Sequence, residues 1–256
     1  MTEKIKEYLE RLEKEKDIKI LLACETGSRA WGFPSPDSDF DVRILYVHKI
    51  DWYLSVNESK DTIDVMLENN DLDISGWELR KSLRLLSKSN APLFERIQSP
   101  IVYKADSEFV LQITELSQHC YSKIATMHHY LSMSKKMLEE IDGKTEYKLK
   151  KFFYALRSAS ACLWIIEKEE IPPIEFSIML NALDEMRPFK SRINELIKIK
   201  SQASEMYLHS GEVEIISFIK DVLKRSDRLA KSLPSSKGNV SKLNRFLSSQ
   251  IKIHGN

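Results

Sequence analysis

Sequence patterns typical of β-strands stop near residue 105 of this 256-residue chain, and helix-like periodicity fills the rest. Alternating or wholly apolar runs occur in the first part, whereas apolar residues recur every three or four positions in the second. This change predicts an α+β fold in two domains: a mixed β-sheet with helices over residues 1–105, then an α-helical bundle over residues 106–256. The Ser/Lys-rich end, residues 233–256, either forms a flexible tail or docks as a helix through its few apolar residues.

The expected elements follow from periodicity, turn residues and prolines. In the first part they are, in chain order, helix 3–16, strand 17–24, a short helix after Ser28, strand 39–47, strands 62–67 and 72–74 around a hairpin at 68–71, helix 76–88, a short helix near Pro92 and strand 101–103. In the second part they are helices 107–140, 145–169, 175–184 and 212–232. We expect no strand beyond residue 110, and a functional site in a cleft between the two parts.

Composition narrows the class of protein. Lys and Arg number 39 against 38 Asp and Glu, for a net charge of +1, so no global attraction to nucleic acid exists, although a local basic groove is not excluded. Cys24, Cys120 and Cys162 are far apart, which supports neither a zinc knuckle nor a disulfide framework and fits free thiols in a reducing compartment. The sequence has no signal-peptide pattern and no apolar run near the ~20 residues of a membrane helix. We therefore expect a cytoplasmic protein without a membrane partner.

The segment from Glu25 to Asp41 holds the most informative residues. Gly27 and Ser28 follow a buried strand and open a short helix, a place where the backbone can approach a phosphate closely and amide groups can bind it. Asp39 and Asp41 then project from the same face of the next strand, with Cα atoms roughly 6.5–7 Å apart. Two carboxylates so placed suit a shared magnesium ion, which prefers a few carboxylates together with substrate phosphates.

Chemistry with two metal ions needs one more carboxylate near the attacking hydroxyl. Asp73 stands between core residues on a predicted neighbouring strand and is the preferred third ligand, with the added task of accepting the hydroxyl proton. Asp64 has the same local pattern on the preceding strand and remains the competitor.

Residues 27–43, Gly-Ser-Arg-Ala-Trp-Gly-Phe-Pro-Ser-Pro-Asp-Ser-Asp-Phe-Asp-Val-Arg, together with the later strand carboxylate at Asp73, resemble the signature of the DNA polymerase beta superfamily of nucleotidyltransferases. The same string, with residues 51–54 and 72–81, is similar to the bacterial and viral branch associated with RNA repair. The resemblance is strong over residues 20–105 and weaker in the helical half, at 151–157 and 172–176.

The resemblance implies that the first domain is the nucleotidyltransferase catalytic domain and the second a helical substrate-binding domain. It implies transfer of a nucleoside monophosphate from an NTP such as ATP to a hydroxyl, with a two-ion magnesium site at Asp39, Asp41 and Asp73. RNA or tRNA is the preferred acceptor. A small molecule or a protein hydroxyl is the alternative within the enzyme class, and a nucleotide-binding regulatory module without turnover is the alternative outside it. Oligomeric state is left open.

Further nucleotide-binding candidates are Ser28, Arg29, Lys151, Tyr154 and Arg157, besides Gly27. Arg29 either holds phosphate or pairs with Glu25, which could equally face water. On the helix over 145–169, Lys150, Tyr154 and Arg157 share a face, with Lys151 beside them. This face either grips the triphosphate or is an ordinary solvated surface. On the helix over 76–88, Arg80, Lys81 and Arg84 could track an RNA backbone, although ordinary surface charge is the simpler interpretation.

Overall fold

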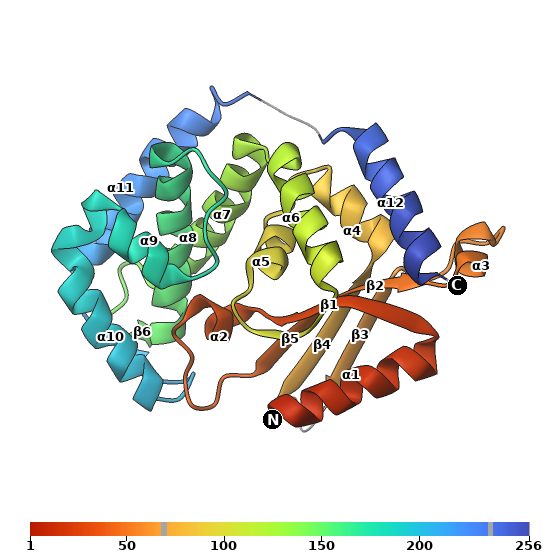
Figure 1. Cartoon of the computed structure of the whole chain (residues 1–256). Helices are drawn as coiled ribbons and strands as arrows, with labels where there is room; N and C mark the ends of the chain where they lie inside the picture. Colours follow the sequence, from red (N-terminus) through yellow and green to blue (C-terminus); the bar gives the residue numbers. More distant parts are fainter. Residues whose placement is uncertain (68–70, 235–237, 256) are drawn as a thin grey trace. The chain divides into compact units, whose positions relative to one another are not determined.

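A computed structural model describes residues 1–67, 71–234 and 238–255 (Figure 1). The chain divides into two compact units. The first comprises residues 1–27, 39–121 and 236–256, and the second comprises residues 28–38 and 122–235. This division is not the expected pair of contiguous domains that meet at residue 105. The expected hairpin turn at 68–71 lies largely outside the described residues.

The first unit is built on a five-stranded sheet with the order β3-β4-β2-β1-β5. The strands are β1 Ile18–Glu25, β2 Phe40–His48, β3 Thr62–Leu67, β4 Leu72–Glu78 and β5 Val102–Ala105. The pair β2 and β4 is parallel, and the other neighbours are antiparallel. The sheet is therefore mixed, and the predicted α+β class is confirmed.

One face of this sheet is apolar because alternate residues of each strand point toward α1 (Thr2–Lys16). Ile5, Leu9 and Leu12 of α1 lie on one helical stripe and are at most 1% exposed. They pack in one cluster with strand residues such as Val42 and Ile74. Burial of each such side chain contributes roughly 1.5–3 kcal/mol. The sheet face that carries the polar residues Asp41 and Asp73 is consequently the opposite one.

The helix expected over residues 76–88 begins later than predicted, since α4 spans Leu79–Leu86. Gly76, Trp77 and Glu78 still belong to β4, whose parallel pairing with β2 continues to the pair Tyr46 and Glu78. A Cβ atom at Gly76 would lie 2.7 Å from Ile44 Cγ1, so only glycine fits there without a shift of neighbours. Glu78 then caps the helix, accepting hydrogen bonds from two amides of its first turn at 2.8 and 3.1 Å.

The end of the chain docks on the first unit as helix α12 (Val240–His254), the second of the two expected outcomes. Leu243 is 5% exposed, and the ring of Phe246 stacks on Phe109 at 5.7 Å between centroids. Phe109 belongs to α6 (Ser107–Cys120), which is part of the same unit. The other helices of this unit are α3 Ile50–Leu54 and α5 Ala91–Gln98.

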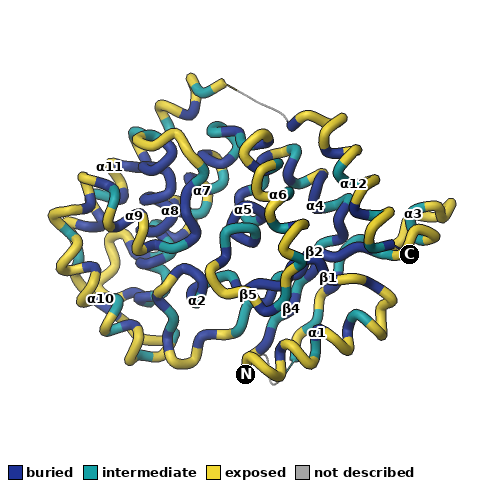
Figure 2. Tube along the Cα trace, in the orientation of Figure 1, coloured by how far each residue is buried: buried dark blue, intermediate teal, exposed yellow. Residues whose placement is uncertain are grey.

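The second unit is almost wholly helical. Among the described residues, its helices are most of the short α2 (Gly27–Trp31), α7 Lys123–Leu138, α8 Leu149–Glu167, α9 Phe176–Ala182, the 3₁₀ helix η2 Asp184–Phe189, α10 Lys190–Gln202 and α11 Val213–Ala230. Helix α8 is the central one, buried along most of its length (Figure 2). Two short strands, β6 Tyr147–Lys148 and β7 Leu208–His209, pair with each other. The expectation of no strand beyond residue 110 was therefore wrong at these four residues, which are too few to show a sequence period.

The helix expected over residues 107–140 is two helices, α6 and α7. Tyr121 and Ser122 between them have extended backbone angles, and Ser122 precedes the first turn of α7. Neither residue is a glycine or proline, so the break carries no turn signal in the sequence. Among the described helices, none is both long enough and apolar enough to cross a membrane.

Candidate active site

Two of the predicted carboxylates face one another on neighbouring strands of the first unit. Asp41 of β2 and Asp73 of β4 are direct partners in the parallel register. The guanidinium of Arg43 lies between them, and its Nη2 atom donates to Asp41 Oδ1 and to Asp73 Oδ2, each at 2.7 Å. Both carboxylate side chains are 31% exposed and that of Arg43 is 17% exposed. The two acids therefore converge on one cationic group at the edge of solvent.

Gly27 fixes the position of Asp41 from the other side. Its backbone has φ +64°, and a Cβ atom there would lie 2.2 Å from Asp41 Oδ2. The backbone of Asp41 is also held, because its carbonyl accepts from the amide of Thr26 at 2.9 Å. From the sequence, we expected Gly27 to let the backbone approach a phosphate closely. In the structure its missing side chain makes room for a carboxylate.

Glu25 is a site residue that sequence reasoning underrated. Its side chain is fully buried, contrary to the view that it could face water. Its Oε1 accepts from the amide of Asp41 at 2.6 Å, and its Oε2 accepts from the hydroxyl of Tyr103. The signal was the unbroken apolar run before it, since a buried strand that continues for one more residue buries that residue as well.

Asp39 precedes β2 and is exposed. Within residues 1–67, 71–234 and 238–255, no three His, Cys, Asp or Glu side chains gather closely enough to hold a metal ion. The structure thus brings Asp41 and Asp73 together without Asp39. Two carboxylates that already converge on a cation fit magnesium, which commonly takes one or two carboxylates and completes its shell with water and substrate phosphates.

Asp64, the competitor for the third position, lies on β3 opposite Ser75 rather than opposite Asp73. Its side chain is 60% exposed and accepts from the Ser75 hydroxyl at 3.2 Å and from Lys60 Nζ at 3.4 Å. The Arg43 guanidinium bonds to Asp73 instead. The geometry therefore favours Asp73 over Asp64 as the partner of Asp41.

A second arginine of the first unit, Arg96 of α5, was not anticipated. It is 4% exposed, its guanidinium carbon lies 3.3 Å from the centre of the Trp77 ring, and its Nη1 has no hydrogen-bond partner within the part of the chain that the structure describes. Burial lowers the pKa of Arg96 to about 9. Cys24 donates its thiol hydrogen to the Arg96 carbonyl at 3.2 Å, and burial raises the pKa of that thiol to about 12. Cys24 thus stays protonated near neutral pH and is not a nucleophile.

The predicted residue Ser28 belongs to the second unit and is 5% exposed. Its hydroxyl donates to Ser38 Oγ at 3.1 Å, and Ser38 Oγ donates to Glu205 Oε1 at 2.9 Å. The other oxygen of Glu205 accepts from Lys150 Nζ at 2.5 Å. A hydrogen-bonded chain therefore links Ser28 through Ser38 and Glu205 to the first turn of α8. Glu205 lies far from this segment in sequence, so no local pattern indicated it.

Lys200 contacts the segment 28–38, which also contains Ser28 and Ser38. Its Nζ donates to Ser35 Oγ at 2.9 Å, and the residue is 2% exposed. Burial lowers the pKa of the Lys200 ammonium, and the nearby charge of Lys150 lowers it further, while Glu205 opposes both effects. Sequence periodicity had placed no helix at this position, and α10 carries the residue there.

The other predicted nucleotide-binding residues serve different contacts. Arg29 Nη2 donates to the Ser38 carbonyl at 2.6 Å, and Lys151 Nζ donates to Glu140 at 2.9 Å. The rings of Tyr154 and Trp31 meet edge to face, 4.9 Å apart. Arg157 is 1% exposed, with its guanidinium 4.3 Å from the Trp31 ring centre and bonded to the Ile174 carbonyl at 3.0 Å. In this structure Arg157 is a packing residue, and Lys150 is the cation connected to Ser28.

Comparison with known proteins gives a consistent result. The family described as RlaP, the RNA repair pathway DNA polymerase beta family, matches residues 1–249. The Bacillus subtilis (strain 168) protein named "Uncharacterized protein YcgL" is 38% identical over 253 residues, which cover 98% of this chain and 97% of that protein.

Two further matches are weaker. A Drosophila melanogaster protein, the tRNA (34-2'-O)-methyltransferase regulator WDR6, is 28% identical over 118 residues, which are 45% of this chain but 11% of that protein. A crystal structure of a nucleotidyltransferase-like protein from Exiguobacterium sibiricum 255-15 aligns with 89% of this chain and 75% of that one, at 12% identity and a TM-score of 0.31, too low to carry an argument. On the match over residues 1–249, the chain belongs to the RNA repair pathway DNA polymerase beta family.

Proposed function

We propose that the protein transfers a nucleoside monophosphate from an NTP to a hydroxyl group of RNA and releases pyrophosphate. The observation that carries this proposal is the pair Asp41 and Asp73, held on adjacent strands around a single cationic group. Membership in the polymerase beta family supports the reaction class, and the name of the family supports RNA as the acceptor.

In this proposal Asp41 and Asp73 hold magnesium, and Asp39, the residue directly before β2, is a further ligand. Magnesium bound there would stabilise charge on the attacking and leaving oxygens. The acceptor oxygen forms a bond to the α-phosphorus while the bond from that phosphorus to the pyrophosphate oxygen breaks. Asp73 accepts the proton of the acceptor hydroxyl. Arg43 would have to release at least one carboxylate, because its Nη2 atom now takes the place of a cation.

The phosphates of the NTP are assigned to Gly27 and Ser28, with Arg29, Lys150, Lys151 and Tyr154 as further candidates. Ser28 and Lys150 are the strongest of these because both end the hydrogen-bonded chain through Glu205. A triphosphate can replace Ser38 as the partner of Ser28 and Glu205 as the partner of Lys150. Arg157 is left out because its guanidinium is bonded to the Ile174 carbonyl and lies against the Trp31 ring.

The test is release of pyrophosphate from each NTP with magnesium, with and without total RNA, followed by transfer of radiolabel from the preferred NTP. Label in RNA supports the proposal as a whole. If the label appears in a small molecule or a protein instead, the proposed reaction holds but its acceptor is not RNA. The Asp73→Asn variant is the control for contaminating activity. Absence of any magnesium-dependent pyrophosphate release from every NTP would contradict the proposal.

A regulatory module that binds a nucleotide without turnover is the second candidate. The observation that favours it is Arg43, whose guanidinium donates to both carboxylates at 2.7 Å. Calorimetric NTP binding without pyrophosphate release would select this candidate. For either function we propose a cytoplasmic location, because Cys24, Cys120 and Cys162 are all buried free thiols.

A further inference from the structure

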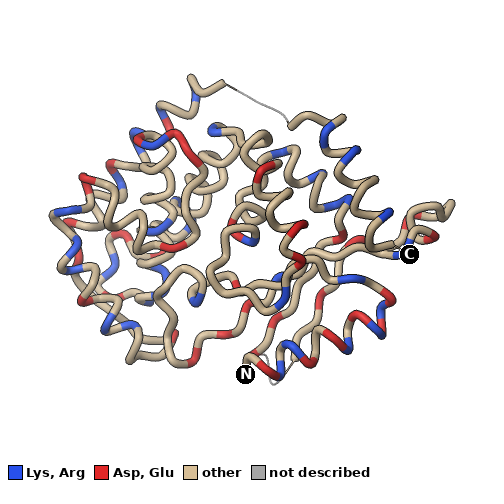
Figure 3. The backbone as a smooth tube through the Cα atoms, in the orientation of Figure 1, with Lys and Arg blue, Asp and Glu red and all other residues tan. Residues whose placement is uncertain are grey.

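Helices α4 and α12 of the first unit form a basic surface. They lie in contact, and together they carry six Lys and Arg, three in α4 and three in α12, but no Asp or Glu. In Figure 3 both helices show blue and no red. Such a concentration stands out in a chain whose 39 basic and 38 acidic residues nearly cancel. The charge is therefore gathered here rather than spread evenly.

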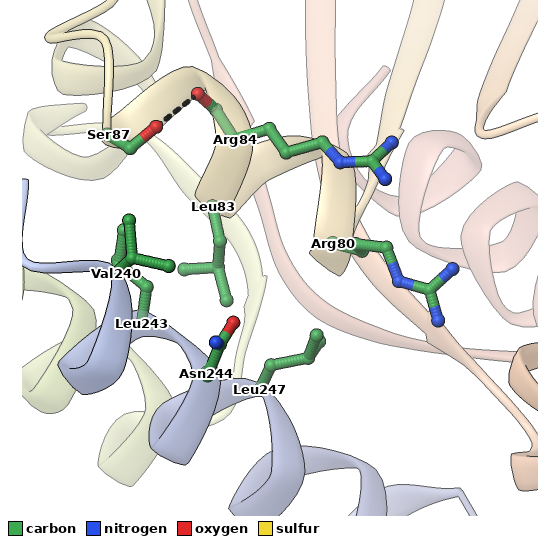
Figure 4. Close-up of a pocket in the computed structure, with 8 residues that line it drawn as sticks. All are labelled: Arg80, Leu83, Arg84, Ser87, Val240, Leu243, Asn244 and Leu247. Carbon is green, nitrogen blue, oxygen red and sulfur yellow. Dashed lines mark hydrogen bonds between the residues drawn. The ribbon is translucent and has the colours of Figure 1, made fainter.

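A groove of about 320 Å³ lies between these two helices (Figure 4). Leu83, Leu243 and Leu247 give it an apolar wall, and Arg80 and Arg84 line it on the α4 side. In Figure 4 the side chains of the two arginines leave α4 on the same side, while Leu83 points toward α12. The volume lies in the range of small-molecule sites, which start near 300 Å³. The groove thus combines an apolar surface with two guanidinium groups one helical turn apart.

These two arginines have no carboxylate partner in the described ranges. Among the described residues neither Arg80 nor Arg84 makes an ion pair, whereas Lys81 of the same helix pairs with Asp61 at 2.8 Å. The Arg80 guanidinium instead lies 5.0 Å from the ring centre of Tyr53 and 5.9 Å from that of Trp52. Unpaired nucleobases commonly stack on aromatic rings or on arginine guanidinium planes.

The aromatic side chains also line a second pocket, of about 50 Å³, which shares Arg80 and Arg84 with the groove. Three acids line this pocket, and two of them are engaged, Asp61 with Lys81 and Glu78 with amides of α4. Glu58 is the third, and it is exposed. The described residues that line the groove include no Asp or Glu, whereas those that line this second pocket include three.

We infer that the α4–α12 groove binds the acceptor as single-stranded RNA, with Arg80 and Arg84 on phosphates and the leucine wall against a base or ribose. This inference rests on the proposed function, because it assigns a binding surface to the acceptor of that reaction. Strand β4 carries the chain about 17 Å from Asp73 to Glu78, at roughly 3.3 Å per residue, immediately before α4. An RNA strand of several nucleotides spans that length. An acidic peptide would also satisfy the arginines, and it is the proposed acceptor, RNA, that selects the single strand as the occupant.

The test is fluorescence anisotropy of a labelled 12-nucleotide single-stranded RNA at several salt concentrations, without NTP or magnesium, so that it does not depend on turnover. The first variant is Arg80→Gln with Arg84→Gln. Its control is Lys224→Gln with Arg228→Gln, which removes the same charge from exposed positions at the same spacing on α11. A third variant, Asn244→Glu, places a carboxylate in the groove at an exposed position of α12.

We expect the arginine variant to bind at least tenfold more weakly at moderate salt, and the slope of log Kd against log salt to fall by about 1.4, because two single-strand phosphate contacts at ~0.7 each are lost. Asn244→Glu should also weaken binding, and the control should not. Duplex RNA of the same length should bind less well than the single strand. Equal binding by all variants, no binding by the wild type at low salt, or preference for the duplex would overturn the inference. None of these outcomes alters the pyrophosphate test, so the two can fail separately.

Discussion

At the residue scale, the most constrained contact is that between Gly27 and Asp41. Gly27 has positive φ and no room for a Cβ beside the Asp41 carboxylate. Gly32 also has positive φ, at +92°, but a Cβ there would meet nothing within 4 Å. A comparison of alanine substitutions at these two glycines therefore distinguishes the effect of backbone strain from the effect of displacing the carboxylate.

Gly27→Ala should lower turnover by about 100-fold or more, because the new methyl group moves a carboxylate that must be held in place. Gly32→Ala should keep near wild-type turnover. Each variant should lose about 1 kcal/mol or somewhat more of folding free energy from the left-handed backbone. Chemical denaturation and pyrophosphate release measure the two effects. Equal activity of the two variants would show that Asp41 does not depend on Gly27.

Arg43 gives a second prediction at this scale. Arg43→Gln leaves two facing carboxylates without a cation, so the metal-free protein should lose about 1.5–3 kcal/mol of folding free energy. Magnesium should then raise the melting temperature of this variant more than that of the wild type, because it replaces the missing charge.

The control for that experiment is Arg192→Gln, which also removes an arginine between two carboxylates, those of Glu195 and Glu212. Melting temperatures of the wild type and of both variants are measured with and without magnesium. A magnesium response in Arg43→Gln no greater than in the wild type and in Arg192→Gln would argue against a cation site at Asp41 and Asp73.

At the element scale, helix α12 is held on the first unit by the stack of Phe246 on Phe109, by apolar contacts, and by polar contacts such as that of Gln250 Nε2 with Gln112 Oε1 at 3.1 Å. Phe246→Ala removes the ring that stacks on Phe109 and should cost about 2 kcal/mol of folding free energy, less than a fully buried phenylalanine. Ile253 of the same helix is 60% exposed, so Ile253→Ala should change stability by less than about 0.5 kcal/mol. Similar denaturation midpoints for both variants would mean that α12 does not contribute to the unit.

Sequence patterns predicted most elements because each carries its own period. Strand 62–67 has the same bounds in the structure, and the apolar stripe of α1 is the expected one. The start of α4 was placed too early, because whether Gly76 to Glu78 continue a strand depends on pairing with β2, which lies elsewhere in the chain. Helix α10 was missed, and its buried Lys200 interrupts the apolar face that a period search needs.

The candidate site shows the same limit. Alternation along β2 predicted a polar face that carries Asp41, and Arg43, two residues further along the same strand, bonds to that carboxylate at 2.7 Å. That Arg43 also reaches Asp73 follows from the parallel register of β2 and β4, which no local pattern contains. Glu205 accepts from Ser38 and from Lys150, both distant in sequence, and only the fold of the second unit brings the three residues together.

At the scale of the whole molecule, the chain has two compact units, and the proposed nucleotidyl transfer depends on Asp41 and Asp73 of the first unit. Asp73 and Asp64 lie on paired strands, but only Asp73 bonds to the group that Asp41 also contacts. The two residues are therefore a matched pair for substitution by alanine.

The most direct measurement is turnover together with calorimetric binding of magnesium-NTP for Asp73→Ala and Asp64→Ala. Asp73→Ala should lose about 100-fold or more in turnover and keep nucleotide affinity within about twofold, because its duty lies with the acceptor hydroxyl rather than with the triphosphate. The Asp64 side chain is exposed to solvent, so the Asp64→Ala variant should keep turnover within about twofold of the wild type. An inactive Asp64→Ala beside an active Asp73→Ala would contradict the account and move the site to the neighbouring strand.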